Sequence, residues 1–171
     1  MSAPAALPQI SFTAPGFDLA FMASLHEYGF AAVVDHPLDD ERVARIYGEW
    51  LAFFSSGNAA CFRMDPVKQD GYFSLKEAEH AKGFVERDFK EYFQFYPWGR
   101  CPESLRVDLA SHFDAAVELG AELLSCIARS LPEAVTTELT EPLEEMIQGS
   151  GQSMLRVLHY PPVPVGRPVL R

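Results

Sequence analysis

The sequence of 171 residues lacks the long apolar runs and leader segments that direct a chain into a membrane or out of the cell. No stretch approaches the roughly 18 consecutive apolar residues that a transmembrane helix requires. The first residues, MSAPAALPQISF, carry no basic segment ahead of a long apolar run, which is the pattern of a secretory signal. We therefore expect a cytoplasmic protein with no membrane partner.

The sequence also has few basic residues. It contains 14 Lys and Arg against 24 Asp and Glu, which gives a formal net charge of −10, and no basic cluster interrupts the acidity. Proteins that bind nucleic acids use Lys and Arg to replace the counterions of the phosphates, so we expect no nucleic-acid partner. The same negative charge would repel an anionic membrane surface.

Only three cysteines are present, Cys61, Cys101 and Cys126, and they lie far apart with no C-x-x-C motif. This number and spacing exclude a disulfide framework and a zinc knuckle, so we expect buried free thiols in a reducing compartment. Apolar residues are plentiful, at 48% of the chain, and include 13 Phe, 6 Tyr and 2 Trp. That content excludes a disordered chain, and the length suits a single domain with a sizeable core.

Hydrophobic periodicity divides the chain into short elements. Gly29 favours the end of one helix, Pro132 the end of another, and Asp39 is a suitable N-cap for a third. The expected helices cover residues 17–28, a segment after Asp39, 74–81, 102–131 and a short stretch near 142–147. The expected strands cover residues 7–12, 30–34, 71–73, 91–95 and 153–160. In the helix after Asp39, the spacing predicts the burial of Val43, Ile46, Tyr47, Trp50, Leu51 and Phe54.

The last expected strand, residues 153–160, alternates with a period of two. Met154, Arg156, Leu158 and Tyr160 would share one face of it, and Leu155, Val157 and His159 the other. The prolines that follow cannot lie inside a sheet, so the strand has nothing after it in the chain to pair with.

Aromatic residues crowd residues 84–98, and two interpretations fit them. They form the wall of a pocket, or they form a core layer beneath a loop-rich region. Aromatic side chains supply large buried areas wherever they occur, which favours the core layer. The residues concerned are Phe84, Phe89, Tyr92, Phe93, Phe95, Tyr96 and Trp98.

One spacing is typical of a metal site. His112 and Asp114 form an H-x-D motif, and His159 supplies a second histidine downstream, as in the facial triad of non-haem Fe(II) oxygenases. That triad needs H-x-D on a strand, where residues i and i+2 share a face. Here the motif lies in the long expected helix, where Asp114 would point about 200° away from His112. We therefore interpret His112 as a histidine at the edge of the core and Asp114 as a surface residue, and expect no metal ligand. No nucleophile elbow, P-loop or dinucleotide-binding motif is present.

Six segments, taken in order, are similar to motifs of one family. They are Pro8-Gln9-Ile10, HEYGFAAVVDHPLD at 26–39, WLAFFSSG at 50–57, DGYF at 70–73, DFKEYF at 88–93 and LRVLHYPP at 155–162. The second resembles the family segment "GFf-v-nHgi", and the last resembles the family strand "lR-hYPp". Together they resemble the N-terminal part of the isopenicillin-N-synthase-like family of Fe(II)/2-oxoglutarate-dependent oxygenases.

The resemblance implies an α+β chain: the helical N-terminal region of a double-stranded β-helix (jelly-roll) oxygenase, with only the first barrel strand or strands present. Residues 1–6 would be a tail, 7–131 the N-terminal region, and 132–171 the truncated start of the barrel. In the family, the iron triad and the R-x-S that holds the cosubstrate lie after the YPP motif. The resemblance therefore implies no catalytic and no metal-binding residue in this chain. Fe(II) and 2-oxoglutarate would bind the complete enzyme, and neither is expected to bind the chain alone.

The resemblance implies roles for a few residues of this chain. Tyr160 matches a family tyrosine that helps to bind 2-oxoglutarate, although it could equally be an ordinary strand tyrosine before a proline turn. Leu158 replaces the family asparagine two positions earlier, which puts one polar contact to the cosubstrate in doubt. Tyr72 and Phe73 would line the substrate mouth. His36 matches a histidine of a structural turn, and Arg156 a basic position with a structural role.

Two hypotheses follow for the function. In the first, the chain is the N-terminal portion of an oxygenase that hydroxylates, desaturates or cyclises a small organic substrate, and is inactive alone. In the second, it is a non-catalytic binding module, or one half of a split enzyme that a C-terminal partner completes. An in-frame H-x-D/E encoded soon after Arg171 would favour a truncation, and a stop codon would favour a module.

Overall fold

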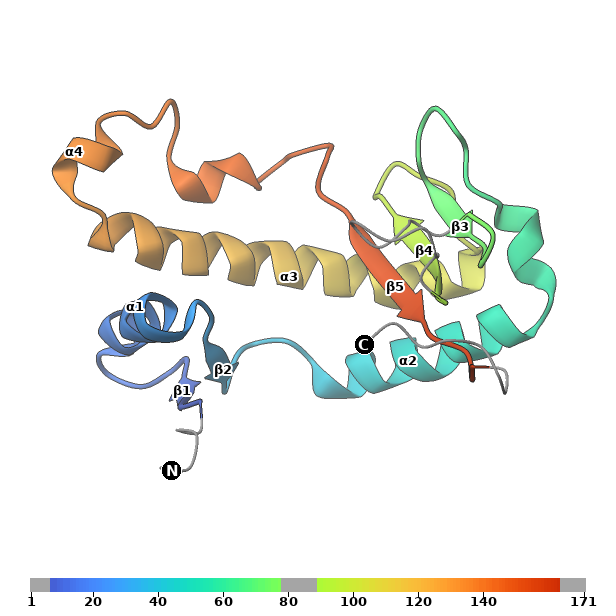
Figure 1. Ribbon diagram of the computed structural model, residues 1–171, viewed down its shortest axis with the longest axis horizontal. Helices are drawn as coiled ribbons and strands as arrows, with labels where there is room; N and C mark the ends of the chain where they lie inside the picture. The colour runs from blue at the N-terminus through green and yellow to red at the C-terminus, as the bar shows by residue number, and fades with distance from the viewer. Residues whose placement is uncertain (1–6, 78–88, 164–171) are drawn as a thin grey trace. The chain divides into compact units, whose positions relative to one another are not determined.

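The structure is a computed structural model that describes residues 7–77 and 89–163 (Figure 1). It consists of two compact units. The first comprises Met1–Leu38 and Asp114–Ser150, and the second comprises Asp39–Phe113 and Gly151–Arg171. The long helix α3 (Glu103–Ser130) contributes residues to both units and agrees with the helix predicted for 102–131. Within the described ranges, no helix combines the length and apolar character needed to cross a bilayer.

The first unit contains two short parallel strands joined by a helix. Strand β1 (Gln9–Ser11) pairs with β2 (Ala32–Val34), and α1 (Phe17–Tyr28) connects them. Helix α1 ends as predicted, because Gly29 takes a left-handed φ of 79° and donates its N–H to the carbonyl of Leu25. The strand expected at 30–34 begins only at Ala32. The core of this unit consists of Ile10, Phe17, Phe21 and Cys126.

The rest of the first unit follows helix α3. Pro132 ends α3 as predicted and caps a single further turn, α4 (Glu133–Thr136), which the sequence analysis missed. The short helix expected near residues 142–147 is one 3₁₀ turn, η2 (Leu143–Met146). Gly149, with φ of 68°, follows within a few residues and leaves no room for a longer helix.

The second unit opens with α2 (Asp40–Ser55), followed by a 3₁₀ turn, η1 (Asn58–Phe62). Asp39 is its N-cap as predicted, since its carboxylate accepts the backbone N–H of Arg42 at 3.0 Å. The predicted buried set was partly wrong. Ile46, Trp50 and Phe53 are buried, whereas Tyr47 is 71% and Leu51 54% exposed. The buried stripe follows positions i, i+4 and i+7, and Tyr47 and Leu51 lie one position further round the helix.

Three antiparallel strands form the sheet of the second unit, in the order β3, β4, β5 (Figure 1). Strands β3 (Gly71–Phe73) and β4 (Glu91–Phe95) are the extended segments that the sequence predicted. The final strand, β5 (Leu155–His159), pairs with β4, so its partner precedes it in the chain. Of the helix expected at 74–81, residues 75–77 form a turn, and residues 78–81 lie outside the described residues.

Phe93 and Phe95 of β4 form a core layer between the sheet and the helices of the second unit, and Tyr92 is buried on the other face of the sheet. The ring centroids of Phe93 and Trp50 lie 4.8 Å apart, and those of Phe95 and Phe113 lie 6.0 Å apart. Tyr92, Phe93 and Phe95 are buried, which confirms the core interpretation for them, whereas Trp98 is exposed and Phe84 lies outside the described residues. Burial of each such ring stabilises the unit by about 1.5–3 kcal/mol.

Candidate functional site

The two faces of strand β5 differ as the sequence predicted. On one face, the imidazole of His159 stacks on Phe54 of α2 with ring centroids 5.3 Å apart. On the other, Arg156 lies over the ring of Tyr92 at 4.6 Å, and Leu158, opposite Tyr92 in the register, is 45% exposed. Tyr160 directly follows β5 and is 63% exposed. A ligand could therefore reach the side chain of Tyr160.

On the α2 side of the sheet, three polar side chains form a cluster that the sequence analysis did not predict. The hydroxyl of Tyr72 donates to Oε2 of Glu91, and Nδ1 of His159 lies 2.7 Å from Oε1 of the same carboxylate. Glu91 and His159 are directly opposite each other in the β4–β5 register. The one available signal was a carboxylate within the largely aromatic strand Glu91–Phe95. A buried carboxylate requires hydrogen-bond donors, and here they come from the two neighbouring strands β3 and β5, which are far from β4 or from each other in the sequence.

Burial raises the pKa of Tyr72, and the adjacent Glu91 carboxylate raises it further. The phenol therefore stays protonated and acts as a donor to Glu91. Phe73, next in the chain, points to the opposite face of the sheet, where it is buried and stacks on Tyr92 at 4.6 Å. The structure thus places Tyr72 and Phe73 on different faces, one in the polar cluster and the other in the core.

In the DGYF motif, Asp70 directly precedes β3 and Gly71 is the first residue of the strand. Asp70 is 1% exposed, and its Oδ2 accepts the backbone N–H of Arg100 at 2.7 Å. Gly71 has φ of +100°, and a Cβ at this position would lie 2.5 Å from the carbonyl oxygen of Phe62. Only glycine tolerates both the conformation and the close approach. These two residues therefore shape the entry to the strand.

His112 and Asp114 both lie in helix α3, as predicted. His112 is half-buried and Asp114 is exposed. Burial lowers the pKa of His112, and the positive charge of Arg42 lowers it further. Within residues 7–77 and 89–163, no group of three His, Cys, Asp or Glu side chains is placed to hold a metal ion. The described residues therefore supply no set of side chains that would hold an iron ion.

Two small hollows lie where helix α2 meets strand β5. The first, of about 270 Å³, is lined by residues that include Tyr47, Leu51, Phe54 and Leu158. The second, of about 280 Å³, includes Val43, Ile46, Tyr47 and Leu155 in its lining, and also His112 and Arg156. Nearly all of these side chains are apolar. The hollows therefore suit apolar side chains better than a charged ligand.

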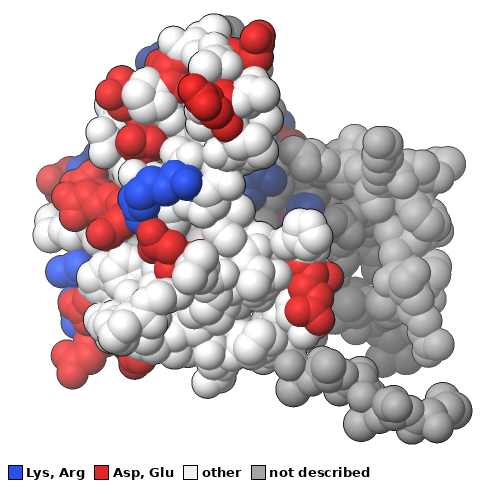
Figure 2. Space-filling view, turned by 90° about the vertical axis from the view of Figure 1, so that its left-hand side faces the viewer, with Lys and Arg blue, Asp and Glu red and all other residues white. Residues whose placement is uncertain are grey.

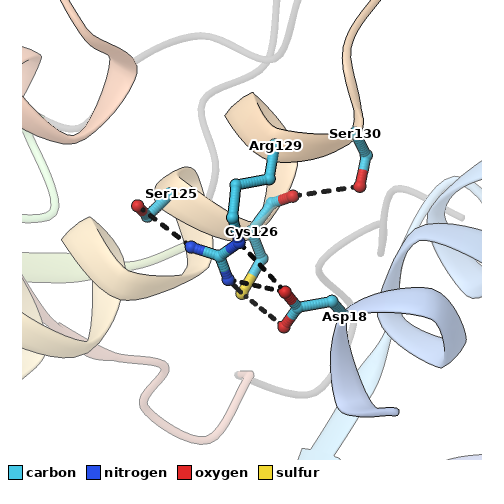
Figure 3. A network of polar contacts seen from close by, with 5 residues as sticks. All are labelled: Asp18, Ser125, Cys126, Arg129 and Ser130. Atoms are coloured by element: carbon cyan, nitrogen blue, oxygen red, sulfur yellow. Dashed lines mark hydrogen bonds and ion pairs between the residues drawn. The ribbon is translucent and has the colours of Figure 1, made fainter.

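The first unit has a polar network of its own, in which Arg129 and Cys126 of α3 point toward Asp18 of α1 (Figure 3). Arg129 donates to Oδ2 of Asp18 at 2.6 Å, and the Cys126 thiol donates to Oδ1 at 3.1 Å. The hydrogen bond from Arg129 holds the pKa of Asp18 below its ordinary value, and burial raises the pKa of Cys126. A protonated, buried thiol is unreactive, so the network links two helices and is no nucleophilic site.

A hollow of about 500 Å³ adjoins this network and contains further carboxylates, among them Glu118, Glu122 and Glu144. On the face seen in Figure 2, acidic side chains are scattered with few basic ones among them.

All three cysteines are free. Cys101 and Cys126 are buried as predicted, whereas Cys61 is exposed, because the short turn η1 leaves it at the surface.

No protein-family model and no curated protein matches the chain. Solved structures do. A "putative oxygenase" from Shewanella oneidensis is 37% identical, with a TM-score of 0.84 over 95% of this chain and 57% of its own length. A "putative 2OG-Fe(II) oxygenase family protein" from Caulobacter crescentus is 24% identical, with a TM-score of 0.68 over 93% and 57%. A full-length protein of Neurospora crassa, solved in complex with alpha-KG, is 17% identical, with a TM-score of 0.60 over 91% and 54%. The chain thus spans little more than half the length of these structural neighbours.

Proposed function

We propose that the chain is the N-terminal portion of a non-haem Fe(II)/2-oxoglutarate-dependent oxygenase of the isopenicillin-N-synthase-like family. The observation that carries this proposal is the similarity to the Shewanella oneidensis protein, at 37% identity and a TM-score of 0.84 over 95% of this chain. The two less similar neighbours share the fold, and one of them was solved with alpha-KG. In this proposal the β3–β4–β5 sheet is the start of a jelly-roll barrel, and the complete enzyme works in the cytoplasm on a small organic substrate.

The complete enzyme would bind Fe(II) and 2-oxoglutarate, which together with O₂ supply the oxidising power for hydroxylation, desaturation or ring closure. Because the described residues hold no set of metal ligands, no catalytic step is assigned to this chain, and we expect it to be inactive alone. Its contribution is to position the cosubstrate and to exclude water from one side of the site.

Tyr160 is the residue that we propose for cosubstrate binding. Its exposed side chain is free to donate a hydrogen bond to an anionic oxygen of 2-oxoglutarate. Leu158 lies two residues earlier and offers an apolar contact where the family has an asparagine, so it would keep water from that side of the cosubstrate. Tyr72 would border the substrate mouth, and Phe73, buried on the other face of the sheet, would support the strand that carries it.

The proposal is tested with the protein encoded by the whole reading frame that contains this chain. We expect it to consume O₂ and form succinate only when Fe(II) and 2-oxoglutarate are both present, and we expect the purified chain of residues 1–171 to do neither. Turnover by residues 1–171 would refute the missing-triad argument. Absence of turnover by the longer protein across a panel of small substrates, together with no 2-oxoglutarate binding in calorimetry, would refute the proposal itself.

Tyr160→Phe provides the matching residue-level test. Loss of one hydrogen bond to a charged ligand weakens binding by about 1.5–3 kcal/mol, so KM for 2-oxoglutarate should rise by roughly tenfold or more while the protein stays folded. Tyr47→Phe, which removes a hydroxyl from the exposed side of α2, is the control and should leave KM unchanged. Equal KM values for the two variants would remove Tyr160 from the site.

A further inference from the structure

The side chain of His159 lies at the point where the chain leaves the β3–β4–β5 sheet. His159 is the last residue of β5, and its pair with Glu91 is the final pair of the β4–β5 register. Tyr160 follows directly, and Pro161, which has no backbone N–H to continue the ladder, comes next. The side chain of Tyr160 is 63% exposed, so packing restrains it little. Its position therefore depends on how firmly His159 is fixed.

Two neighbouring elements fix the imidazole ring of His159. Its Nδ1 lies 2.7 Å from Oε1 of Glu91 on β4, and because a carboxylate only accepts hydrogen bonds, Nδ1 is the donor. The ring stacks on Phe54 of α2 with an interplanar angle of 16°. Glu91 is itself oriented, since its other oxygen, Oε2, accepts the hydroxyl of Tyr72 on β3. One carboxylate oxygen is thus directed to β3 and the other to β5.

The carboxylate of Glu91 contributes geometry more than stability. Glu91 is 9% exposed, and a buried carboxylate gives up much of its hydration. Well-packed apolar side chains in place of a buried ion pair often leave a protein equally stable or more stable. A hydrogen bond, unlike an apolar contact, fixes both the distance and the angle between its two partners. The effect that we expect from this cluster is therefore the orientation of His159.

We infer that Glu91 and His159 are positioning residues for 2-oxoglutarate: Glu91 orients His159, and His159 holds the end of β5 so that the hydroxyl of Tyr160 stays in place for the cosubstrate. The inference rests on the proposed function, in which Tyr160 donates a hydrogen bond to 2-oxoglutarate. A donor that is already in place loses less conformational freedom on binding, so the ligand binds more tightly. Neither Glu91 nor His159 needs to touch the cosubstrate in this arrangement.

The test is a double-variant cycle in the protein encoded by the whole reading frame. Kd for 2-oxoglutarate is measured by calorimetry with Fe(II) and without O₂, so that no turnover occurs. His159→Phe keeps a ring against Phe54 and removes the donor to Glu91. We expect His159→Phe and Tyr160→Phe each to raise Kd by about tenfold, and the double variant to raise it by about tenfold as well. Independent contributions would instead multiply to about a hundredfold.

Two further variants control for effects other than orientation. His159→Asn retains a donor, because the amide nitrogen of asparagine is bonded to Cγ as Nδ1 of histidine is, and it should recover most of the lost affinity. Leu105→Ala removes a buried side chain of α3 in the same unit, and should lower stability without changing Kd. A role in stability alone would make His159→Phe behave like Leu105→Ala.

The order of the chain at Tyr160 gives a readout that does not depend on the cosubstrate. In protein with isotopically labelled tyrosine, the backbone amide of Tyr160 should have an NMR order parameter of about 0.85 in the parent and below about 0.6 in His159→Phe. If His159→Phe does not fold, Glu91→Gln replaces it, since glutamine keeps the volume of glutamate but offers one acceptor oxygen in place of two. Glu91→Gln should raise Kd in the parent and leave it unchanged in Tyr160→Phe.

The outcomes separate this inference from the proposed function. Additive losses in the cycle, or the same order parameter at Tyr160 in the parent and in His159→Phe, would overturn the inference alone, while weaker binding by Tyr160→Phe would still support the proposed function. A raised Kd in His159→Phe with an unchanged Kd in Tyr160→Phe would move the contact to His159 and also overturn it. A parent protein that binds no 2-oxoglutarate would overturn the proposed function and this inference with it.

Discussion

Replacing Tyr72 with phenylalanine removes one hydroxyl group and one hydrogen bond to the buried carboxylate of Glu91. Hydrogen bonds to charged groups contribute about 1.5–3 kcal/mol, and loss of a donor leaves a buried acceptor without its partner. Glu91 keeps its contact with His159 at 2.7 Å, so the cost should fall in the lower part of this range, about 1.5–2 kcal/mol. For a chain of this size the thermal midpoint should fall by about 3–8 °C.

The pH dependence of the same variant provides a sharper test. Burial and the Glu91 carboxylate raise the pKa of Tyr72 above its ordinary value of 10.0, so the folded state retains the phenolic proton at a pH where the unfolded chain releases it. The stability that Tyr72 contributes is therefore complete below about pH 10 and declines as the pH rises beyond that value. Tyr72→Phe removes this decline.

The assay is urea unfolding, monitored by circular dichroism, of the parent, Tyr72→Phe and the control Tyr47→Phe. It is carried out at about pH 8 and at about pH 10.5, one value below and one above the ordinary pKa of tyrosine. The difference between parent and Tyr72→Phe should be largest at the lower pH and smaller at the higher, whereas Tyr47→Phe should follow the parent at both. If Tyr72→Phe unfolds within about 0.5 kcal/mol of the parent at the lower pH, the size of an ordinary surface substitution, the hydrogen bond to Glu91 does not contribute as described.

Two further predictions concern other parts of the fold. Gly71→Ala should destabilise the second unit by about 2–4 kcal/mol in urea unfolding, because φ is +100° and the new Cβ would meet the Phe62 carbonyl. Gly48→Ala in helix α2, where nothing lies within 4 Å, should instead stabilise it by up to about 1 kcal/mol, and the same sign for both would contradict the geometry. Asp18→Asn should destabilise the first unit at neutral pH. The gap to the parent should close as the pH falls below about 4, since the lowered pKa of Asp18 supplies stability only while the carboxylate is ionised. A gap that does not narrow as the pH falls would assign the effect to packing.

Features of the fold that depend on contacts between residues close in the sequence were predicted correctly. The cap at Asp39 and the helix end at Gly29 each depend on groups within four residues, and both are present in the structure. The alternation along β5 was also correct, because it follows from the pleat of any strand. The error over Tyr47 and Leu51 shows the limit. Periodicity identifies an apolar side of a helix, but the elements packed against it decide which part of that side is covered.

The residues of the candidate site also fall into those that the sequence indicated and those that it did not. Tyr160 was assigned through the resemblance of residues 155–162 to a family strand, and its contact with the cosubstrate stays a prediction; the structure shows that its side chain is exposed. Glu91 was not found, because its two partners, Tyr72 and His159, come from strands 19 and 68 residues away. No local pattern encodes such a pairing.

The sequence by itself determined the three long helices α1, α2 and α3, the cap at Asp39, the helix end at Gly29, the alternation of the last strand and the net charge of −10. It could do so because propensities, caps and charge act through neighbours along the chain. Only the tertiary structure decided that β5 pairs with β4, that Glu91 is held between Tyr72 and His159, and that Tyr47, Leu51 and Leu158 surround one hollow. These contacts join segments that are far apart in the sequence, and their formation costs loop-closure entropy. No local sequence pattern specifies which distant segments come together.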